Sequence, residues 1–219
     1  MITLYGHSFS RAHRNLWMLK ELGVPFEHVP TGFFDGSTKK PEFLAINPNG
    51  RVPVLVDDGQ PIFESMAINL YLARKFRGEL APQSLVEEGL ATQWSFWVTT
   101  EVEKPLMVAA ANLLMFPEHQ RNKEESQAML QKLDRPLRVL DAHLADRQHI
   151  LGGGFTVADL NVSAPFSLGV LAGVNFGEYP NLKDWMHRCL ERPAAADWKP
   201  ITFTIPRPET ALGMLTAFV

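Results

Sequence analysis

The sequence has little of what marks several common protein classes. Cys189 is the single cysteine among its 219 residues, so no disulfide can form within the chain. No apolar run approaches the roughly 18 residues of a membrane-spanning helix, and the first residues lack the layout of a signal peptide. The net charge of −3 gives no argument for binding nucleic acid or an anionic membrane. We therefore expect a soluble, cytoplasmic protein with neither nucleic acid nor membrane as a partner.

Metal and nucleotide motifs are also missing. The seven histidines show no spacing typical of metal ligands. No glycine loop of the Walker or dinucleotide type is present, and Gly152 to Gly154 is predicted to be a plain break between helices. The sequence predicts that the protein holds no metal.

Residues 47–65 form the most informative stretch of the chain. Asn49-Gly50 is typical of a turn, and Asp58-Gly59 of a tight hairpin between two short strands. Pro53 has no N–H to give to a sheet, so it belongs at the start of a strand or in a turn as the cis isomer. Ser65 then suits the N-cap of a helix.

The same stretch offers three features to a ligand. The backbone of Val52, beside a proline, is left to pair with an extended peptide. The Ser65 hydroxyl and the first N–H groups of the following helix favour an anion, and Glu64 favours an ammonium group. Together they suit an extended peptide with a free amino-acid head group. A plain hairpin followed by a capped helix is the alternative.

Three segments resemble the cytosolic glutathione transferases. Asn-Pro-x-Gly-x-Val-Pro at 47–53, followed by Glu-Ser at 64–65, resembles the glutathione-binding half of that family. Residues 6–14 resemble the catalytic-serine segment of its phi-like and theta-like classes, and Thr156-x-x-Asp159 resembles a box in its helical domain. The resemblance covers nearly the whole chain and is weakest past residue 195. It implies a serine-type glutathione transferase, active as a homodimer.

The chain order agrees with such a fold. A β-α-β pattern over residues 2–29 precedes the hairpin and a helix over 65–76, which predicts a thioredoxin-like sheet. Helical patterns dominate beyond residue 85. We expect a thioredoxin-like glutathione-binding domain over 1–78 and an all-helical domain over 85–219 that forms the electrophile pocket.

Two prolines lie inside the predicted helices. Pro105 should kink or split its helix. Leucines spaced by three and four predict one amphipathic helix over residues 129–144, in which Pro136 has no evident reason.

Ser10 is the predicted catalytic residue. It lies just before the first helix, where a plain N-cap is the alternative. The resemblance implies that its hydroxyl donates to the sulfur of glutathione. Lowering a thiol pKa by about two units needs roughly 2.7 kcal/mol, and a hydrogen bond to a charged group supplies about 1.5–3 kcal/mol. Ser8 and Tyr5 are the competing donors. Arg14 either adds positive potential near the sulfur or is a surface arginine.

Glutathione-binding residues follow from the same resemblance. They are Lys39, Arg51, Val52, Pro53, Glu64 and Ser65. Lys39 matches a lysine that contacts the glycyl carboxylate, although Thr38 stands where related enzymes often carry histidine, and Lys40 is the substitute. Arg51 replaces the more usual glutamine or lysine.

The electrophile pocket is the least defined prediction. Its candidates are Phe9, Phe34 and Met107, with Phe33, the face from Met107 to Met115, and Phe203, although such residues are more often core. The resemblance implies conjugation of glutathione to a hydrophobic electrophile. Glutathione-dependent peroxidase or isomerase activity is the first alternative, and a non-catalytic binding protein of the same fold is the second. No cysteine lies near Ser10, which disfavours thiol–disulfide chemistry.

Overall fold

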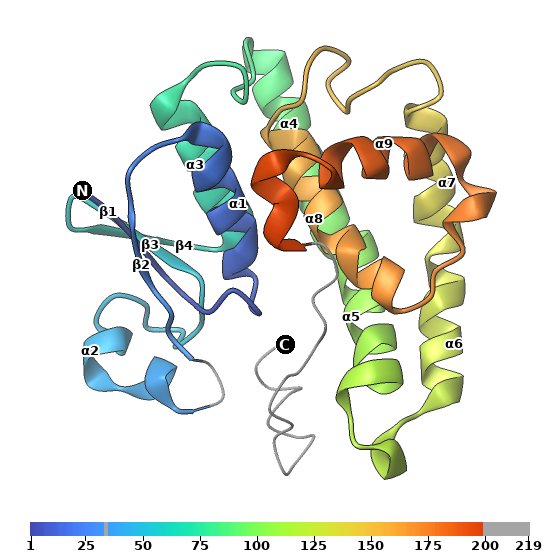
Figure 1. The fold of residues 1–219 in the computed structure, drawn as a ribbon, viewed down its shortest axis with the longest axis horizontal. Helices are drawn as coiled ribbons and strands as arrows, with labels where there is room; N and C mark the ends of the chain where they lie inside the picture. The colour runs from blue at the N-terminus through green and yellow to red at the C-terminus, as the bar shows by residue number, and fades with distance from the viewer. Residues whose placement is uncertain (33–34, 199–219) are drawn as a thin grey trace. The chain divides into compact units, whose positions relative to one another are not determined.

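The computed structural model describes residues 1–32 and 35–198. The described chain divides into two units, of which the first is Met1–Ala81 and the second begins at Pro82. The first unit carries the whole sheet, and the second is helical (Figure 1). Among the described residues, none of the helices combines the length and apolar character that crossing a bilayer requires.

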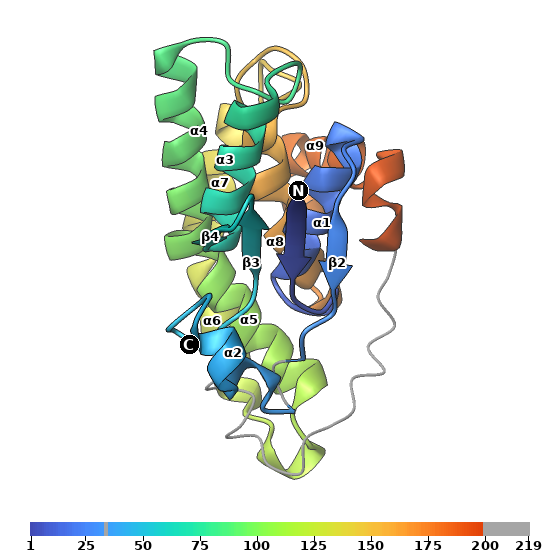
Figure 2. The ribbon, with the colours of Figure 1, turned by 90° about the vertical axis from the view of Figure 1, so that its left-hand side faces the viewer.

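A four-stranded mixed sheet organises the first unit. Its strand order is β2-β1-β3-β4, in which β1 pairs parallel with β2 and antiparallel with β3, and β3 pairs antiparallel with β4. Helices α1 and α3 lie against the sheet (Figures 1 and 2). The predicted thioredoxin-like arrangement is confirmed. The elements are β1 (Ile2–Tyr5), α1 (Ala12–Leu22), β2 (Glu27–Val29), α2 (Pro41–Leu44), β3 (Val54–Asp57), β4 (Gln60–Phe63) and α3 (Ser65–Phe76).

The hairpin between β3 and β4 forms where the sequence predicts it. Asp57 pairs with Gln60, so Asp58 and Gly59 alone make the loop. Their φ angles are 48° and 86°, and two successive positive values define the turn that matches the twist of the strands. Aspartate and glycine are among the residues that adopt this conformation at least cost.

The core of the first unit lies between the sheet and its two longer helices. Leu4 and Leu55 on adjacent strands are fully buried, as are Leu19 on α1 and Leu72 on α3. Each such side chain contributes about 1.5–3 kcal/mol by leaving water. This packing fixes α1 and α3 on the sheet, and both helices begin near the same edge of it.

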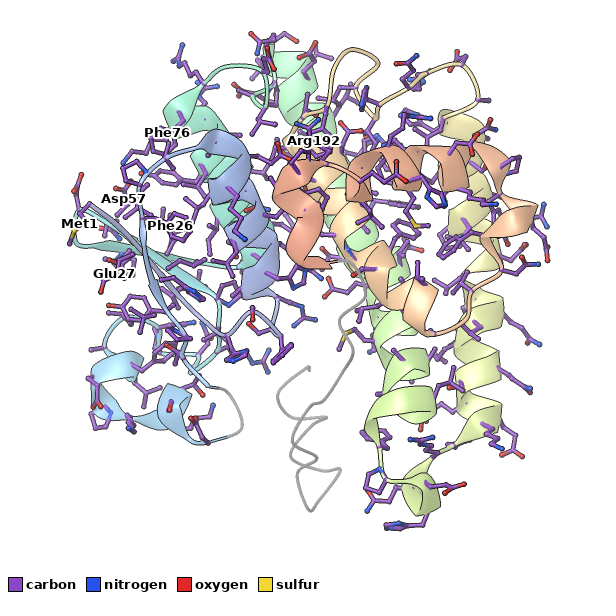
Figure 3. The ribbon with its side chains drawn as sticks, in the orientation of Figure 1. Met1, Phe26, Glu27, Asp57, Phe76 and Arg192 are labelled. Carbon is purple, nitrogen blue, oxygen red and sulfur yellow. The ribbon has the colours of Figure 1, made fainter. Side chains whose placement is uncertain are left out.

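At the opposite edge, α3 ends against the buried carboxylate of Asp57. Tyr71 and Lys75 both donate hydrogen bonds to Asp57 Oδ2. The bond from Lys75, followed by that from Tyr71, holds the pKa of Asp57 below its usual value. Figure 3 shows Asp57 beside Met1, at the end of the sheet where β1 begins. This cluster anchors the last turns of α3 far along β1 from Gly6.

The second unit consists of helices and the segments that connect them. They are α4 (Leu85–Trp97), α5 (Lys104–Ala110), α6 (Lys123–Lys132), α7 (Asp134–His143), α8 (Val157–Leu171) and α9 (Pro180–Leu190). The stretch between α4 and α5, Val98–Glu103, is a π-helical segment. It ends just before Pro105, and such wider turns tolerate a position that lacks a backbone N–H. The expected disturbance at this proline therefore takes the form of a π segment.

The prediction of one helix over residues 129–144 is wrong. Helix α6 ends at Lys132, α7 begins at Asp134, and Leu133 forms the junction. Pro136 is the third residue of α7, in the first turn, where backbone N–H groups have no partner within their helix. The break explains the proline that the sequence left unexplained. The leucine spacing survives because both helices bury the same face, including Leu133, Leu137 and Leu140.

The predicted capping box starts α8. Thr156 accepts from the backbone of α8, and Asp159 accepts from the Thr156 N–H at 3.0 Å. The same carboxylate accepts from the Ile150 N–H at 2.9 Å and from the indole N–H of Trp185 on α9 at 2.8 Å. Asp159 thus joins the start of α8 both to α9 and to the loop that precedes α8.

Candidate functional site

Strand register brings three parts of the first unit to one edge of the sheet. Tyr5 pairs with Val54, so Gly6 follows β1 beside the residue that precedes β3, Pro53. Val54 also pairs with Phe63, so Glu64 leaves β4 at the same edge. The segments 6–10, 50–53 and 64–65 therefore meet, although up to 59 positions separate Gly6 from Ser65.

The Val52–Pro53 peptide bond is cis. Within the described residues, the backbone of Val52 takes part in no hydrogen bond, whereas the neighbouring Arg51 carbonyl is held by the Asn47 side chain at 2.7 Å. Asn47 is 2 % exposed, and its Oδ1 atom accepts from the Asn49 N–H at 3.1 Å. Sequence reasoning did not single out Asn47, because its role depends on a turn that only the folded segment forms.

Gly6 brings the catalytic candidate close to Val52. A Cβ atom at Gly6 would lie 3.2 Å from the Val52 Cβ and 3.5 Å from the Ser10 hydroxyl oxygen. It would also lie 2.7 Å from the Ala12 Cβ, so no larger residue fits without movement. The glycine therefore lets the turn before α1 pack directly on the segment that carries the cis-proline.

Ser10 lies in the turn before α1, and Arg11 separates it from the first helical residue, Ala12. Arg11 directly precedes α1 and its side chain provides no cap. The Ser10 hydroxyl instead receives the N–H of the first helical residue, so the capping alternative for Ser10 stays open beside the catalytic one. Its hydroxyl donates to the His7 carbonyl at 2.7 Å and accepts from the Ala12 N–H at 3.1 Å. The side chain is 7 % exposed. The Ser10 proton is thus donated to a backbone carbonyl.

His13 supports the same turn and was not singled out from the sequence. Its Nδ1 atom lies 2.6 Å from the Ser10 carbonyl oxygen, which can only accept, so Nδ1 carries the proton. Burial, followed by the neighbouring Arg14 charge, lowers the pKa of His13 well below its usual value. A neutral imidazole therefore holds the backbone of Ser10.

The competing donors lie differently. Ser8 is exposed in the same turn. Tyr5 is half-buried on β1 and packs its ring edge-on against Phe43 at 6.4 Å between centroids. Phe9, a candidate for the electrophile pocket, is 38 % exposed and stacks on His7 at 4.7 Å.

Arg14 and Ser65 correct two further expectations. Arg14 is 2 % exposed, so the surface alternative is wrong. Ser65 is the first residue of α3 and not its N-cap, which is Glu64 at φ 71°. The Arg14 Nη1 atom donates to the Ser65 hydroxyl oxygen at 3.2 Å. The hydroxyl expected to cap its own helix therefore lies against α1.

The basic candidates gather at the turn before the cis-proline. Lys39 donates from Nζ to the Gly50 carbonyl at 3.2 Å, and it is exposed, as are Lys40 and Arg51. Gly50 has φ 59°, and a Cβ there would lie 2.9 Å from the Thr38 carbonyl oxygen. The glycine of the motif thus allows the Lys39 segment to approach the Arg51 segment.

Several pocket candidates lie elsewhere. Met107 is half-buried on α5, in the second unit. Phe33, Phe34 and Phe203 lie outside the described residues. Among residues 1–32 and 35–198, no group of three histidine, cysteine or acidic side chains is arranged to hold a metal ion.

The chain belongs to the glutathione S-transferase family. The model of the glutathione S-transferase N-terminal domain matches residues 1–74, and that of the C-terminal domain matches residues 104–193. Both the four-stranded unit and the helical unit are thus those of this family.

Individual relatives agree over most of their length. Glutathione S-transferase F10 of Arabidopsis thaliana is 32% identical over 195 residues, covering 85% of this chain and 88% of that protein. GstB of Escherichia coli strain K12, also a glutathione S-transferase, is 32% identical over 199 residues, covering 89% and 95%. The theta-class glutathione S-transferase of Xanthomonas axonopodis pv. citri, solved with glutathione bound, superposes with a TM-score of 0.83 at 29% identity, covering 90% and 95%.

Proposed function

We propose that the protein is a glutathione transferase that activates the glutathione thiol with Ser10 and adds it to a hydrophobic electrophile. One observation carries the proposal: strand register joins the cis-proline segment, the Ser10 turn and the start of α3 at one edge of the sheet. Membership of the family and its glutathione-bound relative support the choice of co-substrate.

The tripeptide would lie along the segment that carries Val52. The Val52 backbone is left to pair with the main chain of the ligand. At one end, Ser65 and the first N–H groups of α3 favour the carboxylate of the γ-glutamyl group, and Glu64 favours its ammonium. At the other end, Lys39 and Arg51 favour the glycyl carboxylate, with Lys40 as the substitute.

The Ser10 hydroxyl has to change partner to act. In the structure it donates to the uncharged main-chain carbonyl of residue His7. A net hydrogen bond of this kind is worth about 0.5–1.5 kcal/mol, whereas one to a charged group is worth about 1.5–3 kcal/mol. A thiolate in reach therefore outcompetes the carbonyl, and catalysis consists of positioning and thiolate stabilisation.

The domain roles follow the same proposal. The predicted domain 1–78, which lies within the unit Met1–Ala81, would bind glutathione, and the helical residues from 85 onward would form the electrophile pocket. Phe9 is exposed enough to meet a substrate, and Met107 lies on α5. Phe34 completes the proposed set from outside the described residues.

A homodimer is part of the proposal, and α4 carries the observation in its favour. Four of its apolar side chains are exposed, namely Leu85 at 83 %, Val86 at 71 %, Leu90 at 37 % and Phe96 at 68 %. Exposed apolar patches on soluble proteins mark contact surfaces. We expect sedimentation velocity to give a dimer and Phe96→Glu to shift it toward monomer.

A cytoplasmic location suits a co-substrate that must stay a thiol.

The test is a titration of bound glutathione. We expect the thiolate absorbance of the wild-type complex to appear at a pH about two units below that of free glutathione. Ser10→Ala should abolish this shift and lower kcat/KM at neutral pH about 100-fold, because 2.7 kcal/mol corresponds to two pKa units. Ser8→Ala, in the same turn, is the matched control and should leave both values unchanged.

Three results would contradict parts of the proposal. A loss with Ser8→Ala but not with Ser10→Ala would assign the donor to Ser8. An unshifted thiol pKa in the wild-type complex would indicate a non-catalytic binding protein. Assays with an aryl halide, a hydroperoxide and a maleyl-type substrate, run in parallel, separate the transferase from the peroxidase and isomerase alternatives.

A further inference from the structure

A buried arginine connects the two helices that begin at the site. Arg14 lies on α1, one helical turn beyond Ser10, and its side chain is 2 % exposed. Its Nη1 atom lies 3.2 Å from the hydroxyl oxygen of Ser65, the first residue of α3. These residues are 51 positions apart in the chain, so the contact depends on the packing of α1 against α3.

The chemistry of the two groups fixes the direction of this hydrogen bond. A guanidinium has five N–H donors and no acceptor, so the Ser65 oxygen must accept. The Ser65 proton therefore points away from Arg14 and stays available for another acceptor. Arg14 in this way turns Ser65 into a donor, which is the role that binding a carboxylate requires.

Two asparagines hold this arrangement in place. The Asn15 side-chain NH₂ donates to the Ser65 carbonyl at 2.8 Å and to the Asn69 Oδ1 atom at 2.7 Å. Asn69 in turn donates to the Arg14 carbonyl at 3.3 Å. Asn15 and Asn69 are both fully buried. The start of α3 is thus locked to the backbone and side chain of Arg14.

Charge adds to this geometry. The Arg14 guanidinium lies in a low-dielectric interior, where its field is screened less than at the surface. The first turn of α3 contributes the positive end of its helix dipole, and no side chain of the described residues caps it. Arginine and helix terminus together favour a negative group at Ser65.

We propose that Arg14 is a positioning residue for the amino-acid carboxylate of the ligand: it orients the Ser65 hydroxyl as a donor and raises the local positive potential. This inference rests on the proposed function, since it deepens the account of the same site. It differs from the sequence-based expectation, which placed the effect of Arg14 at the sulfur.

The experiment measures binding of two ligands by calorimetry. One is glutathione, and the other is glutathione whose γ-glutamyl α-carboxylate is converted to an amide. Arg14→Met keeps an unbranched apolar stem and removes the charged guanidinium. We expect this variant to lower the affinity for glutathione about 10- to 100-fold, which is the size of a charge-assisted hydrogen bond. The affinity for the amide should fall less than about threefold.

Two further variants separate this role from a structural one. Arg14→Lys restores the charge and should recover most of the affinity for glutathione. If the Met variant does not fold, Arg14→Lys is the test, because a lysine lacks the guanidinium fork: the affinity that it still loses should be lost for glutathione and not for the amide. Arg74→Met, which removes an exposed positive charge near the other end of α3, should leave both affinities unchanged.

The outcomes are distinguishable. If Arg14→Met, or Arg14→Lys in its place, lowers the affinities for glutathione and for the amide by the same factor, Arg14 is only structural and the inference is wrong. If instead affinity holds and the thiol pKa rises, Arg14 acts at the sulfur and the inference is again wrong. If the wild type binds neither ligand, the proposed function fails and this inference with it.

Discussion

The two units of the chain treat the starts of their helices differently. In the sheet unit, the residue directly before α1, α2 or α3 provides no side-chain cap, and only the Ser10 hydroxyl reaches an N–H at the start of α1. In the helical unit, Ser84, Asn122 and Thr156 precede α4, α6 and α8, and each of these side chains accepts a backbone hydrogen bond. Helices α5 and α7 have no such cap, because each continues directly from a preceding helical segment. At the start of α9 a residue of another helix takes this role, because Asp141 on α7 accepts from the Leu182 N–H at 2.9 Å.

This difference separates stability from function. A side-chain cap contributes about 0.5–2 kcal/mol by satisfying N–H groups that otherwise lack a partner. The same groups, left uncapped, attract an anionic ligand. Ser65 is not the N-cap of α3, and the Ser10 hydroxyl reaches only the Ala12 N–H at the start of α1. The Ser10 hydroxyl is held within its own turn, whereas the Ser65 hydroxyl is held by Arg14 on the neighbouring helix. In the proposed function both hydroxyls serve the ligand.

The largest expected effect tests the stability side of the comparison. Asp159→Ala leaves the Ile150 N–H, the Thr156 N–H and the Trp185 indole N–H without their common acceptor. Breaking a buried network of this kind should cost about 3–5 kcal/mol of unfolding free energy. Urea unfolding measures it. A loss below about 1 kcal/mol would show that the box is not what holds α8 and α9.

A substitution at the start of α3 should raise stability and weaken glutathione binding. Glu64 has φ 71°, a region that glycine enters freely but glutamate does not. Glu64→Gly should raise the unfolding free energy by about 1 kcal/mol, because it relieves strain. It should also raise the KM for glutathione, because the ammonium loses its partner.

Arg77→Gly is the matched control, since Arg77 also has a positive φ, 48°, but lies just past the other end of α3. It should change stability in the same direction without affecting KM. If Glu64→Gly left KM unchanged, its strained conformation would have no link to glutathione binding.

The smallest effect concerns the pH dependence of stability at the Ser10 turn. Because the pKa of His13 is lowered in the folded chain, the unfolded chain takes up its proton first as the pH falls below about 6.5. Stability contributed by neutral His13 is therefore complete at pH 7 and is lost as the pH falls toward 5.

His13→Asn keeps a donor near the Nδ1 position and cannot titrate. The difference between wild-type and variant unfolding free energies should change by about 1 kcal/mol per pH unit or less below pH 6.5. Urea unfolding at pH 7, 6 and 5 measures this difference. Parallel profiles for the two proteins would contradict the account of His13.

Local signals predicted much of this fold. The turn Asp58-Gly59, the box Thr156-x-x-Asp159 and the helix over residues 65–76 each depend on residues within one or two turns of one another. Contacts across the sheet were less accessible. Asn15 and His13 carry no signal of their own in the sequence, and Asn47 opens a motif without any indication of its role, because the partners of all three are defined only by the folded backbone.

The sequence by itself predicted most of the elements and their order from periodicity and turn residues, and its short motifs carried the resemblance to the family. It missed the break between α6 and α7. The tertiary structure decided which groups lie together at the candidate site. Arg14 is an ordinary helical arginine until α1 packs on α3, and Ser65 looks like a cap until Glu64 takes that place. The physical reason is that burial and hydrogen-bond direction depend on residues 51 positions apart, which strand register and helix packing bring together.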